Sequence, residues 1–400
     1  MLRKALIAGA ALLLPGSALA QISDDMVKIG VLTDKSGIYA DLTGEGSVVA
    51  ATMAVGDFGG KVLGKPVVVV SADHQNKADV ASSIARQWID ADKVDALVDI
   101  VTSSVGLAVQ AIGAEKGIVT LNSGAATVRL TGKECSPTGF HWVYDTYALA
   151  HGTAGAVVAT GGDRWFFLTA DYAFGHSLEA DTAAVVKAAG GTVVGAVRHP
   201  FPASDLSAFL LQAQASGAKV VGLANAGQDL TNSVKQAAEF GLTEGGRQRL
   251  VSLLGTIIDV HSMGLPLAKG LVTTEGFYWD ADDETRAWSR RFLEKTGRMP
   301  TMIQAGVYSS TLHYLRSVEA AGTDEGKAVA ARIRSLPIRD FFAKNGRVAA
   351  NGRMIHDMYL FEVKAPQESK GPWDYYRLVK TIPGDQAFQN PAESGCPLVK

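Results

Sequence analysis

Short apolar segments that alternate with helical segments are the feature that most constrains the fold of this chain. The segments are rich in valine, and helix-like stretches separate them. Uniformly apolar strands between helices are typical of a doubly wound parallel sheet with both faces covered. In the first third of the chain these strand-like segments occupy residues 27–32, 66–71, 96–101 and 118–121.

The same alternation resumes after an irregular segment at residues 131–147. Residues 95–117 and 219–241 share one order of strand, turn of small residues, helix and final glycine. We therefore predict an α/β fold with two Rossmann-like, doubly wound lobes. The later strand-like segments lie at residues 165–169, 192–198, 219–223 and 250–254.

The final third returns to both lobes. Long helices are predicted at residues 285–295 and 303–321, and an antiparallel strand pair at 354–363 and 375–380. Several crossings between lobes form a hinge, as closure around a small ligand requires. We assign residues 27–145 plus 277–345 to the N-terminal lobe, 146–276 plus 346–383 to the C-terminal lobe, and 384–400 to a tail.

The first twenty residues have the pattern of a secretory signal peptide. Arg3 and Lys4 precede an apolar run at residues 5–14, and small residues follow up to Ala20. An apolar run of this length is too short to span a bilayer. We predict cleavage after Ala20 and a periplasmic location.

Charge and cysteine content limit the partners. Without Arg3 and Lys4 the chain keeps 36 basic and 40 acidic side chains, a net charge of −4, which argues against a nucleic-acid partner.

Cys135 and Cys396 are the two cysteines. In an exported chain the simplest arrangement is a disulfide between them, which would tie back the tail; two separate thiols are the alternative.

Residues 101–126 indicate a binding edge. A strand ends in small hydroxyl residues, a helix follows, and a second strand ends in residues 122–126, again small. Right-handed crossover brings both turns to one edge of a parallel sheet. Helix N-termini present free amides there, which favours a carboxylate or another small anion.

Neither catalysis nor a cofactor is expected. Residues 44–50 imitate a dinucleotide fingerprint but lie too far from the preceding strand. Ser103 has no Gly-x-Ser-x-Gly context, and the eight histidines show no metal-site spacing. We predict that the chain is no enzyme and holds no metal.

Four short motifs in order give the chain a family resemblance. They are Gly-Val-Leu-Thr-Asp-Lys-Ser-Gly at residues 30–37, Ser103-Ser104, Ala125-Ala126-Thr127, and Asp-Tyr-Ala-Phe-Gly at residues 171–175. With the signal peptide, they resemble the periplasmic type I solute-binding proteins of the leucine/isoleucine/valine-binding family. The resemblance implies a monomeric receptor that delivers a small ligand to the membrane permease of an ABC importer.

The resemblance also implies ligand-binding positions. Serines at the end of the third strand bind the ligand carboxylate, with amides and a threonine hydroxyl in the next turn; a tyrosine of the second lobe covers the ligand. The positions predicted here to contact ligand are Tyr39, Ser103, Ser104, Ala125, Ala126, Thr127, Tyr172, Asn225 and Thr256.

Two positions depart from the amino-acid-binding pattern. Ala226 stands where amino-acid binders have a tyrosine, and Ile257 stands where they hold an acid for the ligand ammonium. Both losses favour a carboxylate with an apolar or aromatic body, such as an aromatic acid. The alternatives are a branched-chain or other hydrophobic amino acid, or a sensor subunit for a signalling receptor.

Overall fold

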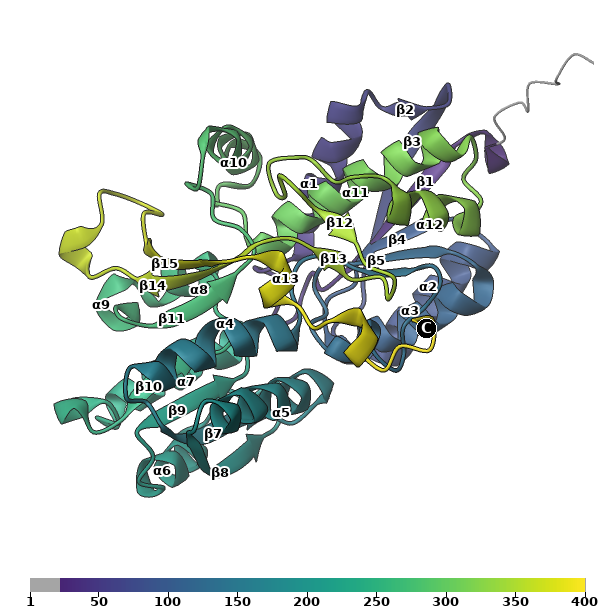
Figure 1. The fold of residues 1–400 in the computed structure, drawn as a ribbon. Coiled ribbons are helices and arrows are strands. Elements are labelled where there is room, and N and C mark those ends of the chain that lie inside the picture. Colours follow the sequence, from purple (N-terminus) through teal and green to yellow (C-terminus); the bar gives the residue numbers. More distant parts are fainter. Residues whose placement is uncertain (1–21, 400) are drawn as a thin grey trace, which may run out of the picture.

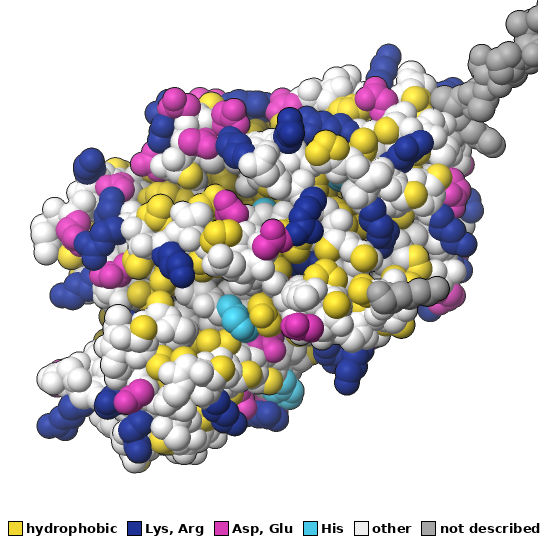
Figure 2. Space-filling model, in the orientation of Figure 1, with side chains coloured by type: hydrophobic (Ala, Val, Ile, Leu, Met, Phe, Trp, Pro, Cys, Tyr) yellow, Lys and Arg dark blue, Asp and Glu magenta, His cyan; other side chains and the backbone are white. Residues whose placement is uncertain are grey.

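The computed structural model describes residues 22–399 and has two α/β lobes (Figure 1). The predicted signal peptide and its cleavage after Ala20 lie outside these residues. Within residues 22–399, no helix has the length and apolar character that crossing a membrane requires. On the face in Figure 2, Lys and Arg are interspersed with Asp and Glu, so neither charge dominates this face.

The first lobe contains a six-stranded sheet of order β2-β3-β1-β4-β5-β6, parallel except for the short hairpin strand β2. Its strands are uniformly buried at the centre, as the valine-rich segments predicted. The strands are β1 (Val27–Thr33), β2 (Lys61–Val62), β3 (Lys65–Asp73), β4 (Ala96–Asp99), β5 (Val119–Asn122) and β6 (Gly139–His141).

Helices from both ends of the chain cover this sheet. The early helices are α1 (Gly44–Phe58), α2 (Ala78–Asp90) and α3 (Ser103–Lys116). The late helices are α10 (Asp283–Thr296), α11 (Met302–Ala321) and α12 (Gly326–Ser335). Helix α11 packs along α1 and is buried over most of its length, because it fills the space between α1, the sheet and α12.

The second lobe contains a parallel sheet of order β10-β9-β7-β8. Its strands are β7 (Arg164–Ala170), β8 (Thr192–His199), β9 (Val220–Ala224) and β10 (Arg249–Ser252). Its helices are α4 (Thr146–Ala159), α5 (Ala173–Ala188), α6 (Ser207–Ala215), α7 (Gln228–Glu239), α8 (Ile257–Met263) and α9 (Leu265–Ala268).

An antiparallel sheet of order β11-β14-β15 lies beside the second lobe (Figure 1). Its strands are β11 (Val272–Glu275), β14 (Met358–Val363) and β15 (Tyr376–Ile382), and β12 (Arg347–Val348) pairs with β13 (Met354–Ile355). The remaining short elements are α13 (Gly384–Ala387) and the 3-10 helices η1 (Ser23–Asp25), η2 (Val128–Leu130), η3 (Glu244–Gly246), η4 (Pro366–Glu368) and η5 (Pro391–Glu393).

Both parallel sheets reverse strand order beside their first strand. In the first lobe β1 lies between β3 and β4, and in the second β7 lies between β8 and β9. A crevice forms outside the carboxyl ends of the strands at such a point. The loops after β1, β4 and β5 therefore face the loops after β7, β9 and β10.

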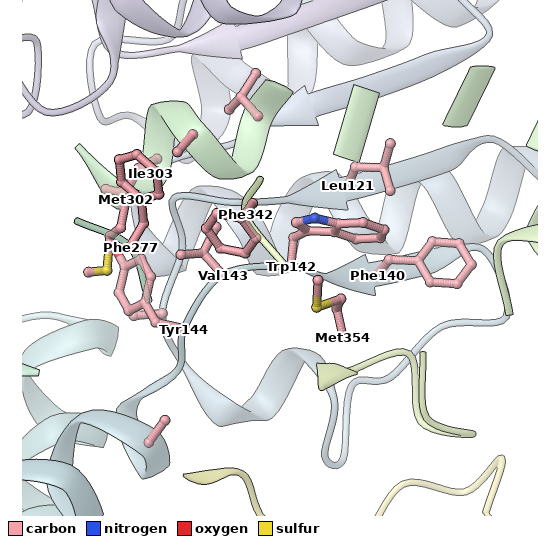
Figure 3. Close-up of a cluster of buried hydrophobic side chains, with 14 of the residues drawn as sticks. Leu121, Phe140, Trp142, Val143, Tyr144, Phe277, Met302, Ile303, Phe342 and Met354 are labelled. Atoms are coloured by element: carbon pink, nitrogen blue, oxygen red, sulfur yellow. The ribbon is translucent and has the colours of Figure 1, made fainter. Parts of the chain in front are cut away.

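Buried polar contacts join the crossings between the lobes. Arg353 donates from Nη1 to the carbonyl oxygen of Tyr144 at 3.0 Å and lies 3.6 Å from the Asp145 carboxylate. His356 Nε2 lies 2.5 Å from the carbonyl oxygen of Val143. Apolar side chains of the neighbouring segments fill the remaining space, including those of Val143, Tyr144, Phe277, Met302 and Phe342 (Figure 3).

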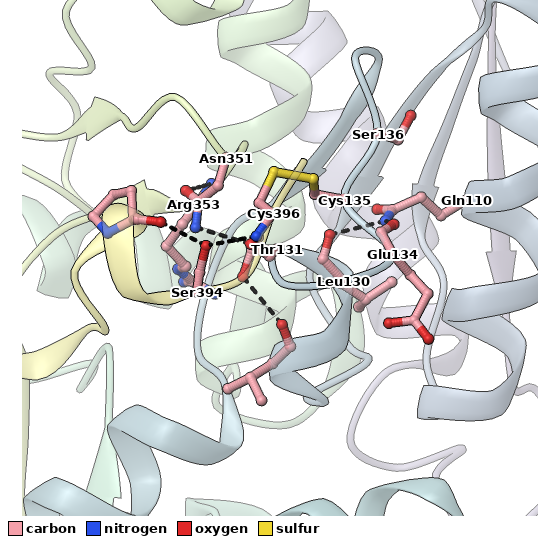
Figure 4. Close-up of a disulfide and its surroundings, with 12 residues drawn as sticks. Gln110, Leu130, Thr131, Glu134, Cys135, Ser136, Asn351, Arg353, Ser394 and Cys396 are labelled. Atoms are coloured by element: carbon pink, nitrogen blue, oxygen red, sulfur yellow. Dashed lines mark hydrogen bonds between the residues drawn. A yellow bond between two sulfur atoms is a disulfide. The ribbon is translucent and has the colours of Figure 1, made fainter. Parts of the chain in front are cut away.

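The predicted disulfide between Cys135 and Cys396 is confirmed, with a Cα–Cα distance of 5.7 Å (Figure 4). Gln110 donates to the carbonyl oxygens of Leu130 and Glu134 and holds the segment that carries Cys135. The bridge therefore fastens the tail to the first lobe.

Candidate functional site

A small cavity lies between the two lobes, with a volume of about 20 Å³. The first lobe contributes the loop after β1, the turn between β4 and α3, the turn after β5, and α11. The second lobe contributes the start of α5, the loop between β9 and α7, and the loop after β10. This is the position that the strand order of both sheets defines for a ligand.

Ser103 joins the two turns of the first-lobe wall. It is the first residue of α3, and its hydroxyl oxygen accepts hydrogen bonds from the amides of Ala126 at 3.2 Å and Thr127 at 3.1 Å. Its side chain is buried and lines the cavity. Because both bonds use the oxygen as acceptor, the hydroxyl hydrogen remains free to donate to a ligand oxygen.

The turn before Ser103 is strained. Asp99, Ile100 and Thr102 have φ angles of 73°, 56° and 76°, a region that β-branched residues such as Ile100 and Thr102 rarely adopt. The carbonyl oxygen of Asp99 accepts from the amides of Ser123 and Gly124 at 2.9 and 3.0 Å. Strain of this kind needs surrounding structure to maintain it and is concentrated at functional sites.

Two tyrosines from opposite lobes meet at the cavity. The hydroxyl oxygens of Tyr39 and Tyr172 lie 2.6 Å apart, and the ring of Phe201 stacks on Tyr172 with 4.1 Å between centroids. Burial raises the pKa of both phenols above the ordinary value, so both remain neutral. In this pair one hydroxyl donates its hydrogen to the oxygen of the other. The accepting hydroxyl keeps its own hydrogen, which it can donate to a ligand.

Two further contacts close the lobes around the cavity. The hydroxyls of Thr127 and Ser177 lie 2.9 Å apart. Gly227, with φ of 59°, packs so tightly that a β-carbon there would lie 2.9 Å from the carbonyl oxygen of Ile38 and 3.0 Å from the Tyr39 ring. The structure is therefore a closed arrangement of the lobes.

Four of the nine predicted ligand-binding residues line the cavity: Tyr39, Ser103, Ala126 and Tyr172. The structure places the other five outside the lining. Among these, Thr127 bonds to Ser177, and the Ala125 carbonyl oxygen lies 2.6 Å from His141 Nε2. The others are Ser104, Asn225 and Thr256.

Asn225 and Thr256 form hydrogen bonds inside the second lobe, although the buried Oδ1 of Asn225 has no hydrogen-bond partner among the described residues. Asn225 donates to the Ser233 hydroxyl at 2.9 Å and lies 3.2 Å from His199 Nε2. Thr256 is the N-cap of α8, where its amide and hydroxyl donate to the Asp259 carboxylate at 2.8 and 2.9 Å. The Asp259 carboxylate is therefore already hydrogen-bonded to Thr256 at the N-terminus of α8.

Several lining residues were not identified from the sequence. Tyr144 lies in the irregular aromatic segment and Phe174 in the Asp-Tyr-Ala-Phe-Gly motif, so each had a signal nearby. Leu254 follows β10, and Leu42 and Ile303 flank it from the first lobe, without a sequence signal for binding. None of the described residues that line the cavity has a charged side chain.

Two α/β lobes closed over a buried cavity at their strand termini define a ligand-trapping receptor. The sequence matches the family model described as "Periplasmic binding protein" over residues 26–372, and the chain belongs to this family. It is a solute-binding protein of the ABC-transporter type, a family of binding proteins rather than enzymes. Such proteins bind small ligands and work with membrane permeases, and the family implies a periplasmic location.

Individual relatives agree with this assignment. A periplasmic binding protein from Burkholderia mallei is 53% identical, with a TM-score of 0.92 over 94% of this chain and 100% of its own. A branched chain amino acid ABC transporter periplasmic ligand-binding protein from Burkholderia xenovorans LB400 is 41% identical, with a TM-score of 0.84 over 94% and 100%. The "Leu/Ile/Val-binding protein homolog 6" of Brucella melitensis is 26% identical over 85% of this chain and 88% of its own.

A more distant structure shares the fold. It is a solute-binding protein of an ABC transporter from R. palustris in complex with benzoate, 22% identical, with a TM-score of 0.82 over 93% of this chain and 100% of its own.

Proposed function

We propose that this chain captures a small aromatic or apolar carboxylate and delivers it to the permease of an ABC importer. The observation that carries the proposal is the cavity between the lobes, which aromatic and aliphatic side chains line without any charged side chain among them. The ligand contacts both lobes when they are closed, so binding shifts the population towards the closed form.

The carboxylate end would lie against Ser103. Its hydroxyl hydrogen is free to donate, and the adjacent N-terminal amides of α3 carry the positive end of the helix dipole. A free tyrosine hydroxyl from the Tyr39–Tyr172 pair supplies another donor. Each charge-assisted bond contributes about 1.5–3 kcal/mol, so three supply much of the roughly 8 kcal/mol of micromolar binding.

The opposite end of the ligand would be apolar. Leu42, Phe174, Leu254 and Ile303 line the cavity together with Ala226, which stands where amino-acid binders have a tyrosine. Asp259, the nearest acidic candidate by sequence, is held by Thr256. An amino acid would bury its ammonium group without a carboxylate partner, which is costly.

Hydrophobic amino acids are the second candidate. The names of the Burkholderia xenovorans and Brucella melitensis relatives refer to branched-chain amino acids and favour this candidate. The R. palustris relative in complex with benzoate illustrates the first candidate on the same fold.

Matched ligand pairs separate the two candidates. We propose thermal-shift and calorimetric measurements with phenylpyruvate against phenylalanine, and 4-methyl-2-oxopentanoate against leucine, with benzoate and 4-hydroxybenzoate as further acids. The two ligands of each pair have the same side chain and carboxylate. They differ at the carbon next to the carboxylate, which carries an ammonium group only in the amino acid. The proposal expects the acid without ammonium to bind more tightly in each pair; a response to the amino acids alone would overturn it.

The proposal includes a mature monomer that begins at residue 21, after cleavage at Ala20. N-terminal sequencing of periplasmic protein tests the cleavage site, and light scattering coupled to size exclusion tests the monomer. A dimer would contradict the predicted monomer, and an uncleaved N-terminus would contradict the predicted cleavage. Neither result would bear on the proposed ligand class, which the matched ligand pairs test.

A further inference from the structure

One side chain outside the cavity connects the two parts of the first-lobe wall. Asn76 follows β3 and is half-buried between the loop after β1, which carries Tyr39, and the turn after β4, which carries Ser103. None of the ligand positions predicted from the sequence includes it.

The amide nitrogen of Asn76 connects to the Tyr39 loop through Asp34. The buried Asp34 carboxylate accepts from Asn76 Nδ2 at 2.5 Å, from the Tyr39 amide at 2.9 Å and from the Gly37 amide at 2.7 Å. Three N–H donors satisfy this carboxylate within the motif at residues 30–37 and its neighbours. The conformation of the loop therefore depends on a side chain from a different strand.

The amide oxygen of Asn76 connects to the other turn. It accepts a hydrogen bond from the hydroxyl of Thr102, the residue that immediately precedes Ser103 and holds a φ of 76°. Only a side chain that donates and accepts at once can make both connections, and a carboxamide does so.

The surroundings hold Asn76 in place. Its backbone has a φ of 57°, a left-handed conformation that asparagine tolerates. Its backbone amide donates to His74 Nδ1 at 3.0 Å, and burial lowers the pKa of His74 to about 4, so this nitrogen stays an acceptor. A β-carbon at Gly37 would lie 2.5 Å from Asn76 Nδ2, so the motif glycine is needed for the close approach.

We propose that Asn76 is a positioning residue that fixes Tyr39 and Ser103 relative to each other before ligand arrives. The proposal rests on the proposed function in one respect, because that function assigns ligand contacts to Tyr39 and Ser103. The polar bridge Tyr39–Asp34–Asn76–Thr102 preorganises the wall, which lowers the ordering cost of binding.

The test uses Asn76→Gly, which removes the carboxamide and keeps the left-handed backbone unstrained. Its matched control is Gln75→Gly, because Gln75 is the adjacent left-handed residue, with φ of 53° and an exposed side chain. Thr102→Val removes one connection only and serves where Asn76→Gly is poorly folded.

Hydrogen exchange of the unliganded protein gives the first readout. Residues 34–43 and 100–106 should both exchange faster in Asn76→Gly, and Thr102→Val should accelerate exchange in residues 34–43, although Thr102 lies outside that loop. Gln75→Gly should match the parent. Unchanged exchange in residues 34–43 for Thr102→Val, or in either segment for Asn76→Gly, would overturn the proposal.

Titration with benzoate gives the second readout. Loss of the bridge should weaken binding about tenfold, with no comparable loss in Gln75→Gly. Equal affinity in parent and Asn76→Gly would overturn the positioning role. If the parent itself does not bind benzoate or the other acids, the proposed ligand class fails, and the exchange result still decides the bridge.

Discussion

Tyr39 of the first lobe and Tyr172 of the second place their hydroxyl oxygens 2.6 Å apart, although 133 positions separate the two residues in the chain. The contact between these two hydroxyls therefore forms only when the lobes are closed. Opening the cleft exposes two phenols that burial keeps neutral and a stacked ring at Phe201.

Tyr172→Phe should favour the open form. It removes one hydroxyl from the pair and retains the stacking on Phe201, so the closed state should lose about 1 kcal/mol. Small-angle scattering of the unliganded protein should show a larger radius of gyration. Tyr375→Phe, which removes a hydroxyl bonded to His261 away from the cleft, is the control; equal radii in all three proteins would contradict the prediction.

Ser103→Ala should weaken binding of a carboxylate by about 1–3 kcal/mol. The substitution removes a donor to ligand and frees the amides of Ala126 and Thr127. Calorimetry with the tightest acid of the panel measures the change. Comparison with Ser104→Ala identifies which hydroxyl contributes, because only Ser103 lines the cavity; unchanged affinity in Ser103→Ala would remove it from the site.

Gly227→Ala should obstruct closure. A methyl group there would meet the Ile38 carbonyl oxygen and the Tyr39 ring across the cleft. Gly245→Ala is the matched control, because Gly245 has a similar φ of 66° but open space around it. Both variants carry the backbone strain of a left-handed alanine, and ligand affinity should fall about tenfold or more in Gly227→Ala alone. Equal loss in both variants would attribute the effect to strain.

Cys396→Ser should destabilise the protein by about 2–5 kcal/mol, since a bridge over 261 residues is lost. Urea unfolding of parent and variant, each with and without reductant, measures the difference. Reductant should lower the stability of the parent to that of the variant and leave the variant unchanged. A stable parent under fully reducing conditions would show that the bridge contributes little.

Asp99→Asn should alter the pH dependence of stability. Burial raises the pKa of this carboxyl from 3.8 to about 7. The folded protein then holds a proton that the unfolded chain releases, so the stability contribution of Asp99 falls as pH rises from about 4 to about 7. The variant should exceed the parent in stability at pH 8, and this advantage should shrink towards pH 5.

Urea unfolding at both pH values provides the comparison, with Asp92→Asn as a control that removes an exposed negative charge. A variant that is less stable than the parent by the same amount at both pH values would mean that Asp99 has no titration linked to folding in this range.

The two-lobed fold could be predicted because apolar periodicity and turn residues are local signals. The disulfide followed from the presence of two cysteines in an exported chain. The family resemblance supplied the cavity positions of Ser103 and Tyr172. Ile303 could not be predicted as a lining residue, since the strands of the second lobe's parallel sheet lie in the sequence between its helix and the first-lobe turns that line the cavity. Thr256 and Asp259 carried a signal that was not used: a Thr-x-x-Asp spacing indicates a helix cap. Pairing of Thr127 with Ser177 depends on lobe closure, which no local pattern encodes.

The late position of α11 in the chain has a consequence for the order of folding. Residues 302–321 fill the centre of the first lobe, yet they are synthesised after every strand of the second lobe's parallel sheet. The first lobe therefore cannot complete its core while the ribosome is still producing the second, and an early fragment would expose the apolar face of α1. Such a chain stays incompletely folded until late in synthesis, a state that suits passage through a narrow secretion channel.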